Sequence, residues 1–287
     1  PLPVRSAAAL PRPSMSSPTL QIAGVRIRLA GPLDWMSEIA VRYEPYLSGR
    51  PADLEVEVEP GDAPRGKEWP FPGVTSKGRT LILSRLDFFA EIDGRRGHAV
   101  LRDPRMALDS FLRVLLSERL ADRGGFLVHA TAIGGRLFPG VSDADKSTLA
   151  RLAPPGSVLS DELVAVVRPH LHGTPFWGSY ARGTNTDRRR LEAILFLDRH
   201  RAECVRAISA PDALARLLEC VVCFRDDECR ARWMLAEAAR VVGSVSCFTL
   251  SYDARKTGYR ELERRLRIHH NGTKTPRRKR RHHSRGA

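Results

Sequence analysis

The segment from Phe126 to Ile133 constrains the fold of this chain more than any other. Its sequence, Phe-Leu-Val-His-Ala-Thr-Ala-Ile, is almost continuously apolar and includes β-branched residues, as expected of a strand buried on both faces. A strand of this kind needs packed layers on both sides, which favours an α/β fold. Around it we predict alternating strands and helices: strands at 136–138, 157–159, 163–167 and 193–197, and helices at 146–152, 211–220 and 226–241. We therefore expect an α/β domain over residues 124–266.

The first half of the chain shows the alternation typical of a partly solvated sheet. Residues 20–29 alternate around a glycine, which predicts a strand or a hairpin, and Leu54–Val58 alternates strictly. The Pro- and Gly-rich residues 60–78 are interpreted as a loop. Three further strands are predicted to form an antiparallel meander: 80–84, 88–92 and 98–101.

A helix is predicted to follow these strands. Asp103-Pro104 has the pattern of an N-cap and a first helical position, apolar residues then recur with a period near 3.6, and Gly124-Gly125 should end the helix. Residues 18–123 are therefore expected to form an antiparallel α+β region.

The net charge of +14 is concentrated at the two ends of the chain. Eight Lys and Arg residues lie in 267–287 and two lie before Pro18, neither end contains Asp or Glu, and residues 18–266 therefore carry only +4. We expect residues 1–17 to be a disordered leader and 267–287 a disordered basic tail. The tail has no aromatic residues for base stacking, so we do not expect nucleic acid as a partner. Electrostatic binding of nucleic acid through the tail is the alternative.

Composition also bears on the compartment. No run of about eighteen apolar residues occurs, so we expect no membrane span, and the apolar stretch near the start is too short for a signal peptide. The five cysteines are an odd number, which favours reduced thiols in a cytoplasmic protein. Cys220 and Cys223 have the spacing of half a zinc site, but we interpret them as core cysteines in a helical stretch because a second pair is missing.

The segment 137–152 has the layout of a phosphate-binding loop. An apolar strand leads into Gly140, a small polar loop follows, and Lys146-Ser147 opens a helix, as in the pattern G-x-x-x-x-G-K-[ST]. In such a loop, backbone N–H groups bind an anion, the lysine reaches the terminal phosphates and the hydroxyl holds Mg²⁺. The glycine expected before the lysine is Asp145. A chance match is the alternative.

Other residues with suitable chemistry lie on either side of this loop. Asp161 and Glu162 end a predicted strand about fifteen residues after Lys146, a spacing that fits one helix and a return strand. The acids could instead be a helix cap or a solvated strand end. His129, in the strand before the loop, is either a site residue or a core histidine.

Two further segments have both a functional and a purely structural interpretation. Residues 172–178 contain glycine, proline and aromatic residues that suit either a substrate-side loop or a packed turn. Arg188-Arg-Arg190 could contact an anionic ligand, although we interpret it as a solvated turn.

Taken in order, these motifs resemble the kinases related to HPr kinase/phosphorylase, which include kinases of some lasso-peptide gene clusters. The motifs are His129-Ala-Thr-Ala, the phosphate loop, Ser160-Asp-Glu and His172-Gly-Thr-Pro-Phe-Trp-Gly, and the resemblance covers about residues 124–250. It implies a P-loop nucleotide-binding domain like that of phosphoenolpyruvate carboxykinase. It also implies a serine kinase that uses ATP and Mg²⁺ on a protein or peptide, and it leaves homo-oligomer formation open.

The resemblance implies roles for individual residues. Asp161 would be the base that takes the substrate hydroxyl proton, and His129 matches a histidine near the loop. Ser147 and Glu162 would hold Mg²⁺. The nucleotide would contact five residues, with Lys146 on the β- and γ-phosphates: Gly140, Ser142, Lys146, Ser147 and Thr148.

The loop departs from the family pattern G-x-S-G-x-G-K-[ST] because both later glycines are aspartates, Asp143 and Asp145. A carboxylate about 5 Å from a phosphate charge costs roughly 3 kcal/mol at an effective dielectric constant near 20. That is roughly a hundredfold in nucleotide affinity for each aspartate. We therefore expect weak or absent ATP binding, and the alternative to a kinase is an inactive pseudokinase that acts as a protein-binding module.

Overall fold

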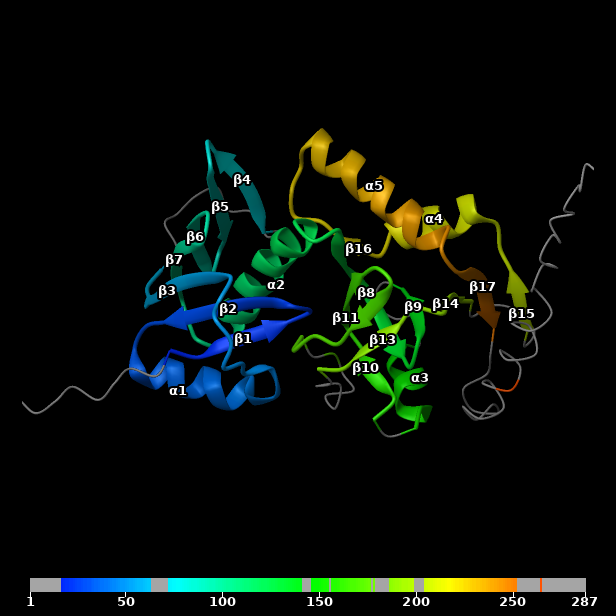
Figure 1. Cartoon of the computed structure of the whole chain (residues 1–287), viewed down its shortest axis with the longest axis horizontal. Helices are drawn as coiled ribbons and strands as arrows, with labels where there is room; N and C mark the ends of the chain where they lie inside the picture. The colour runs from blue at the N-terminus through cyan, green and yellow to red at the C-terminus, as the bar shows by residue number, and fades with distance from the viewer. Residues whose placement is uncertain are drawn as a thin grey trace, which may run out of the picture.

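The computed structural model describes residues 17–62, 72–140, 146–154, 156–176, 178, 186–198, 204–251 and 264. This part of the chain has mixed α/β architecture, with two sheets and five α-helices (Figure 1), in agreement with the predicted α/β class. None of the described helices is long and apolar enough to cross a membrane.

The first sheet has seven strands in the order β1-β2-β3-β7-β6-β5-β4. Their bounds are β1 Thr19–Ile22, β2 Val25–Ala30, β3 Leu54–Pro60, β4 Gly73–Lys77, β5 Thr80–Arg85, β6 Phe88–Asp93 and β7 Arg96–Leu101. The predicted hairpin, the alternating strand and the meander are all confirmed. In β3, apolar residues are buried and glutamates are exposed in strict alternation, so only one face of the sheet packs on the core.

The expected antiparallel arrangement of this region is wrong at one strand. Strand β3 runs parallel to both of its neighbours, β2 and β7. The reason is helix α1 (Leu33–Arg42), followed by the 3₁₀-helix η1 (Glu44–Tyr46), which the sequence did not predict. Helix α1 and the 3₁₀-helix form the connection from β2 to β3 that a parallel pair of strands requires. The predicted loop 60–78 is also wrong at its end, where β4 forms a hairpin with β5.

The second sheet has ten strands and follows the order β13-β12-β11-β8-β9-β14-β17-β15, with β10 and β16 also paired to β8. Its strands are β8 Gly125–Ile133, β9 Arg136–Pro139, β10 Val158–Ser160, β11 Leu163–Val167, β12 His170–His172, β13 Arg188–Arg190, β14 Ala193–Leu197, β15 Cys204–Ala207, β16 Val221–Val222 and β17 Ser246–Ser251. The helices are α3 Lys146–Leu152, α4 Ala210–Leu218 and α5 Glu228–Val242. Every strand and helix predicted for this half is confirmed.

Two local predictions in this half are wrong. Residues 188–190 are not a solvated turn but the outermost strand, β13, which pairs with β12. Residues 220–223 are not helical, because α4 ends at Leu218 and the β-branched pair of β16 then pairs with β8. Cys220 is buried, but Cys223 is exposed and is not a core residue. All five cysteines lie in described segments, and none forms a disulfide.

Strand β8 lies at the centre of the second sheet and is buried on both faces, as predicted. Its even-numbered residues, such as Val128 and Ala130, pack against α4 and α5. On the other face, Leu127 packs with the core of the first sheet and Ile133 packs with α3. Figure 1 shows α4 and α5 on one side of this sheet and α3 on the opposite side. Because side chains alternate along a strand, His129 and Thr131 lie between Leu127 and Ile133 on the α3 side.

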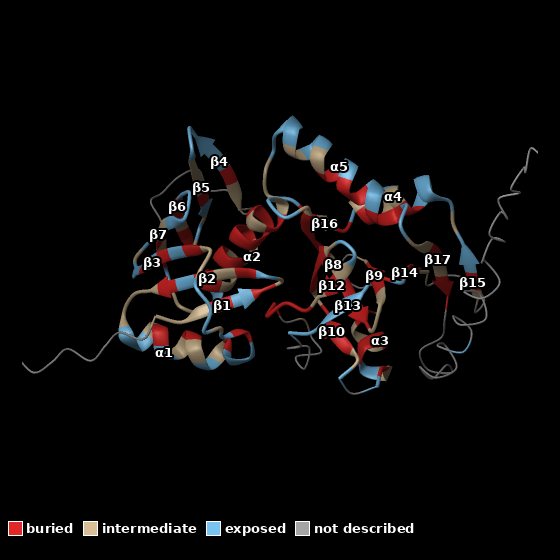
Figure 2. Ribbon diagram, viewed as in Figure 1, coloured by how far each residue is buried: buried red, intermediate tan, exposed pale blue. Residues whose placement is uncertain are grey.

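Helix α2 (Met106–Ala121) belongs to the cores of both sheets, and Figure 2 shows how much of it is buried. Its Phe111 packs edge-to-face on Phe88 of β6, with ring centroids 5.9 Å apart. The same apolar cluster includes Leu127 of β8 and Leu163 of β11. The helix begins two residues later than predicted.

The predicted capping residue, Asp103, still receives hydrogen bonds from the first backbone N–H groups of this region. Its Oδ1 accepts from the N–H of Arg105 at 2.9 Å and from that of Met106 at 2.7 Å. The predicted N-cap is nevertheless wrong, because the helix begins at Met106 and its N-cap is Arg105, whose side chain makes no capping hydrogen bond.

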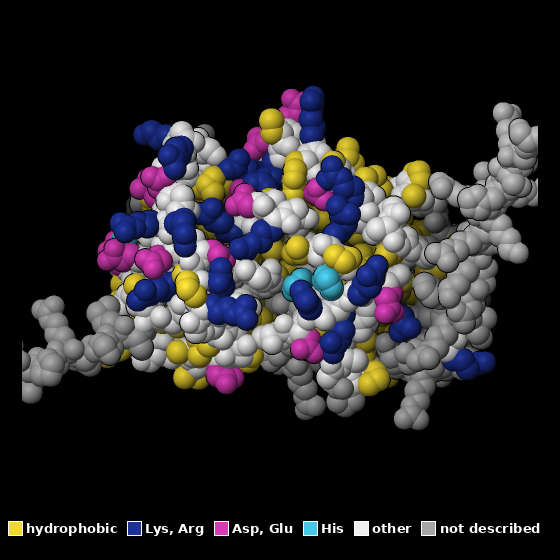
Figure 3. Space-filling model, viewed as in Figure 1, with side chains coloured by type: hydrophobic (Ala, Val, Ile, Leu, Met, Phe, Trp, Pro, Cys, Tyr) yellow, Lys and Arg dark blue, Asp and Glu magenta, His cyan; other side chains and the backbone are white. Residues whose placement is uncertain are grey.

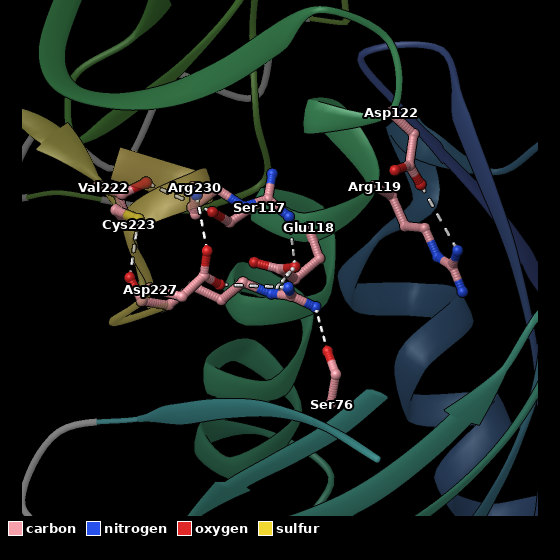
Figure 4. Close-up of polar contacts among 10 residues, drawn as sticks. Ser76, Ser117, Glu118, Arg119, Asp122, Val222, Cys223, Asp227 and Arg230 are labelled. Carbon is pink, nitrogen blue, oxygen red and sulfur yellow. Dashed lines mark hydrogen bonds and ion pairs between the residues drawn. The ribbon is translucent and has the colours of Figure 1, made fainter. Parts of the chain in front are cut away.

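A buried ion cluster joins α2 to Arg225, in the segment between β16 and α5, and to Arg230 in the first turn of α5 (Figure 4). The Glu118 side chain is only 3% exposed, and its Oε2 lies 2.9 Å from Nε of Arg225 and 2.7 Å from Nη2 of Arg230. Arg225 also donates from Nη2 to Oγ of Ser76 on β4, at 2.8 Å. Burial raises the pKa of Glu118, and the two guanidinium groups oppose this shift. The cluster thus connects α2 with β4 of the first sheet and with α5, which packs on the second sheet.

We expect Glu118→Ala to lower the free energy of unfolding by about 3 kcal/mol, because it removes the buried carboxylate shared by two partly buried guanidinium groups and leaves Arg225 paired with the more distant Asp227. The matched control is Glu55→Ala, which removes an exposed pair with Arg28 and should cost less than about 1 kcal/mol. Urea denaturation of the full chain measures both values. Equal losses for the two variants would contradict the importance of the buried cluster.

Candidate functional site

The predicted phosphate loop begins at the end of β9 (Arg136–Pro139), beside the middle of β8. Strand β9 returns beside β8, and the N–H of Gly140 donates to the carbonyl of His129 at 3.0 Å. Helix α3 then begins at Lys146, the predicted residue, with Ser147 and Thr148 in its first turn. Lys146 is 8% exposed. The loop residues 141–145, and with them Ser142, Asp143 and Asp145, lie outside the described residues.

Helix α3 is held against the sheet by its apolar residues. Leu149 and Ala150 are fully buried and pack with Ile133 of β8 and Phe138 of β9. Because both strands also lead into the loop, this packing fixes Lys146 on the same face of the sheet as His129.

The two predicted acids occupy the turn between β10 and β11. The carbonyl of Glu162 accepts from the N–H of Ala130 at 3.1 Å, which fixes the turn beside β8. Oε1 of Glu162 lies 3.8 Å from Nδ1 of His129. The structure therefore brings His129 and Glu162 into contact.

Asp161, unlike its neighbour, is almost completely buried, with 3% exposure. Its Oδ1 accepts from the N–H of Gly178 at 3.2 Å. A Cβ atom at position 178 would lie 2.7 Å from Oδ2 of Asp161, closer than a real contact allows. Glycine at this position is therefore needed for the backbone to approach the carboxylate.

The segment 172–178 is packed rather than open. Oγ1 of the buried Thr174 donates to the carbonyl of Leu163 at 2.6 Å, and Phe176 is buried in the cluster around α2. The contacts of Thr174 and Phe176 hold this segment beside β11 and α2, and Gly178 lies against Asp161. Trp177 lies outside the described residues.

The charges around His129 determine its protonation. Burial lowers its pKa most, Glu162 raises it, and the positive charges of Lys146 and Arg113 lower it further. The imidazole therefore lies within electrostatic reach of both cations, one from α3 and one from α2.

Arg113 is a residue that the sequence reasoning missed. It is half-buried on α2, and its Cζ lies 5.0 Å from the ring centroid of Phe176. Within the described residues it forms no ion pair. One signal could have identified it: an arginine within the apolar run Phe111-Leu-Arg-Val-Leu-Leu, where a solvated charge is not expected.

Two buried hydroxyl groups near β8 have no hydrogen-bond partner among the described residues. They are Oγ1 of Thr131, on the same face of β8 as His129, and Oγ of Ser160, next to Asp161. Buried polar groups are normally hydrogen-bonded, so such groups mark a place where a ligand or water can bind.

Chemically, this arrangement combines anion-binding and proton-accepting groups on one face of β8. Lys146 and Arg113 supply positive charge, and Asp161 and Glu162 supply carboxylates that can accept a proton or hold a cation. No group of three or more His, Cys, Asp or Glu side chains in the described segments could hold a metal ion on its own.

A comparison with models of known protein families finds no match, and a comparison with curated proteins finds no relative of this chain.

We expect Arg113→Gln to raise the pKa of His129, because it removes a nearby positive charge, and Glu162→Gln to lower it. The pKa can be followed through the imidazole ring protons by NMR. Arg28→Gln, in an exposed ion pair on the first sheet, is the matched control and should leave the pKa unchanged. An unchanged pKa in both site variants would show that these charges do not act on His129.

Proposed function

We propose that this chain is an ATP-dependent serine kinase of a protein or peptide, related to HPr kinase/phosphorylase. One observation carries the proposal: Glu162 contacts His129 on one face of β8, Lys146 lies within electrostatic reach of the same ring, and the buried Asp161 adjoins Glu162 in sequence. Lysine, a hydroxyl and two carboxylates around a phosphate loop are the groups that phosphoryl transfer requires.

Different residues of the chain would bind the phosphates and accept the proton. Lys146 binds the β- and γ-phosphates of ATP. Asp161 accepts the hydroxyl proton of the acceptor serine while the serine oxygen attacks the γ-phosphorus and ADP leaves. Its hydrogen bond from Gly178 fixes one carboxylate oxygen, and burial keeps bulk water away from it.

The residues present also fit Mg²⁺. Ser147 and Glu162 offer hard oxygen ligands, and Mg²⁺ is usually held by one or two protein ligands together with substrate phosphates and water. The ion would neutralise charge on the phosphates.

The alternative is an inactive pseudokinase that binds a partner protein. Asp143 and Asp145 favour it, since two carboxylates in the loop oppose the binding of a polyanion.

Calorimetry of Mg·ATP with the full chain tests this proposal. We expect the chain itself to bind more weakly than about 0.1 mM, a typical value for an enzyme substrate. Asp143→Gly with Asp145→Gly should strengthen binding at least a hundredfold, because two repulsive charges are removed.

Adding Lys146→Ala to the glycine variant is the control and should abolish the gain. Micromolar affinity of the unaltered chain would contradict the predicted repulsion. Failure of the folded glycine variant to bind would contradict the phosphate site itself. No detectable binding by the unaltered chain even at millimolar Mg·ATP, together with binding by the glycine variant, would favour the pseudokinase.

A further inference from the structure

A positively charged surface lies at the outer edge of the second sheet. We define the β12–β13 surface by four residues: His170, His172, Arg188 and Arg190. All three residues of β13 are exposed. Figure 3 shows two neighbouring histidine side chains bordered by Lys or Arg side chains, where Figure 1 places β13 and Figure 2 places β12.

The register of the two strands places these four side chains on one face. His170 lies opposite Arg190 and His172 lies opposite Arg188, while the intervening Leu171 faces the core on the other side. The two imidazole rings are 6.3 Å apart. Four basic groups therefore share a small area.

The two arginines of this surface form no ion pairs with carboxylates of the described residues. Arg189, on the opposite face, pairs with Asp187 at 2.8 Å, but Arg188 and Arg190 have no ion-pair partner in the described segments. Burial, His170 and Arg188 lower the pKa of His172 to about 4, so this ring is neutral near pH 7. The positive charge of the surface near pH 7 therefore comes from Arg188 and Arg190, which lie two residues apart on the same face of β13.

This surface lies on the same face of the second sheet as the candidate site. His172 lies beside Ala165 of β11, and two residues earlier in the same strand Leu163 lies beside His129. Three strand spacings separate β8 from β13, which is roughly 14 Å. About five residues of extended peptide cover that distance.

We infer that the β12–β13 surface binds an acidic segment of the phosphoacceptor, so that the substrate is a serine flanked by Asp and Glu residues. This inference rests on the proposed function and adds its substrate class. Charge complementarity supports an anionic partner. A peptide is favoured over nucleic acid because the surface has no aromatic side chain for base stacking, whereas a terminal strand can pair with an extended chain.

Fluorescence anisotropy without nucleotide tests the inference on the full chain. The probe is a labelled peptide with a central serine and six glutamates, and its control has glutamine at those six positions. We expect the glutamate peptide to bind at least tenfold more tightly than the glutamine peptide. Arg188→Glu with Arg190→Glu should weaken this binding at least tenfold.

The matched control is Lys77→Glu with Arg79→Glu, which makes the same charge change on exposed residues of the first sheet and should alter binding less than twofold. Circular dichroism and urea midpoints establish that both variants fold. Absence of preference for the glutamate peptide, or equal losses in the two variants, would overturn the inference. So would a single-stranded DNA of equal charge that binds more tightly than the peptide and depends on Arg188 and Arg190.

The measurement separates this inference from the proposed kinase. Peptide binding by the chain, together with failure of the folded glycine variant to bind ATP, would overturn the kinase proposal and leave the docking surface standing. ATP binding by the glycine variant without peptide binding would overturn the docking surface and leave the kinase proposal standing.

Discussion

The burial of α2 between the two sheets is the interaction on which the rest of the structure depends. Its apolar side chains complete the core of the first sheet and also pack on Leu127 and Leu163 of the second. The helix thereby brings Arg113 next to Phe176 and within electrostatic reach of His129. The Glu118 cluster ties the same helix to the segment before α5. The candidate site is therefore built from both halves of the chain.

Strand β8 positions the residues of the candidate site. One of its faces packs on α4 and α5, which leaves the other to carry His129 between the core of the first sheet and α3. The backbone of His129 and its neighbour fixes Gly140 on one side and Glu162 on the other. Gly140, at the end of β9, and the pair of acids, which follow it in sequence after helix α3, are for this reason held by neighbouring residues of β8.

Much of this arrangement follows from local sequence patterns. The run 126–133 predicts a doubly buried strand because no solvated face interrupts it, and Lys146 marks the start of α3 correctly. The helix α1 and the strand β13 were not predicted, because α1 has only two fully buried residues and β13 has none. The role of Arg113 could not be predicted from spacing, since only the packing of α2 brings it to His129. The contact between Gly178 and Asp161 likewise depends on tertiary structure.

The site is suited to phosphoryl transfer only if Asp161 accepts the proton of the acceptor hydroxyl. The most direct measurement is transfer of the γ-phosphoryl group from ATP to a serine peptide by the chain carrying Asp143→Gly and Asp145→Gly. Asp161→Asn in that background should reduce the rate at least about a hundredfold with little change in ATP binding, whereas the exposed Asp187→Asn should leave it unchanged. Transfer that persists with asparagine at position 161 would contradict the proposed mechanism.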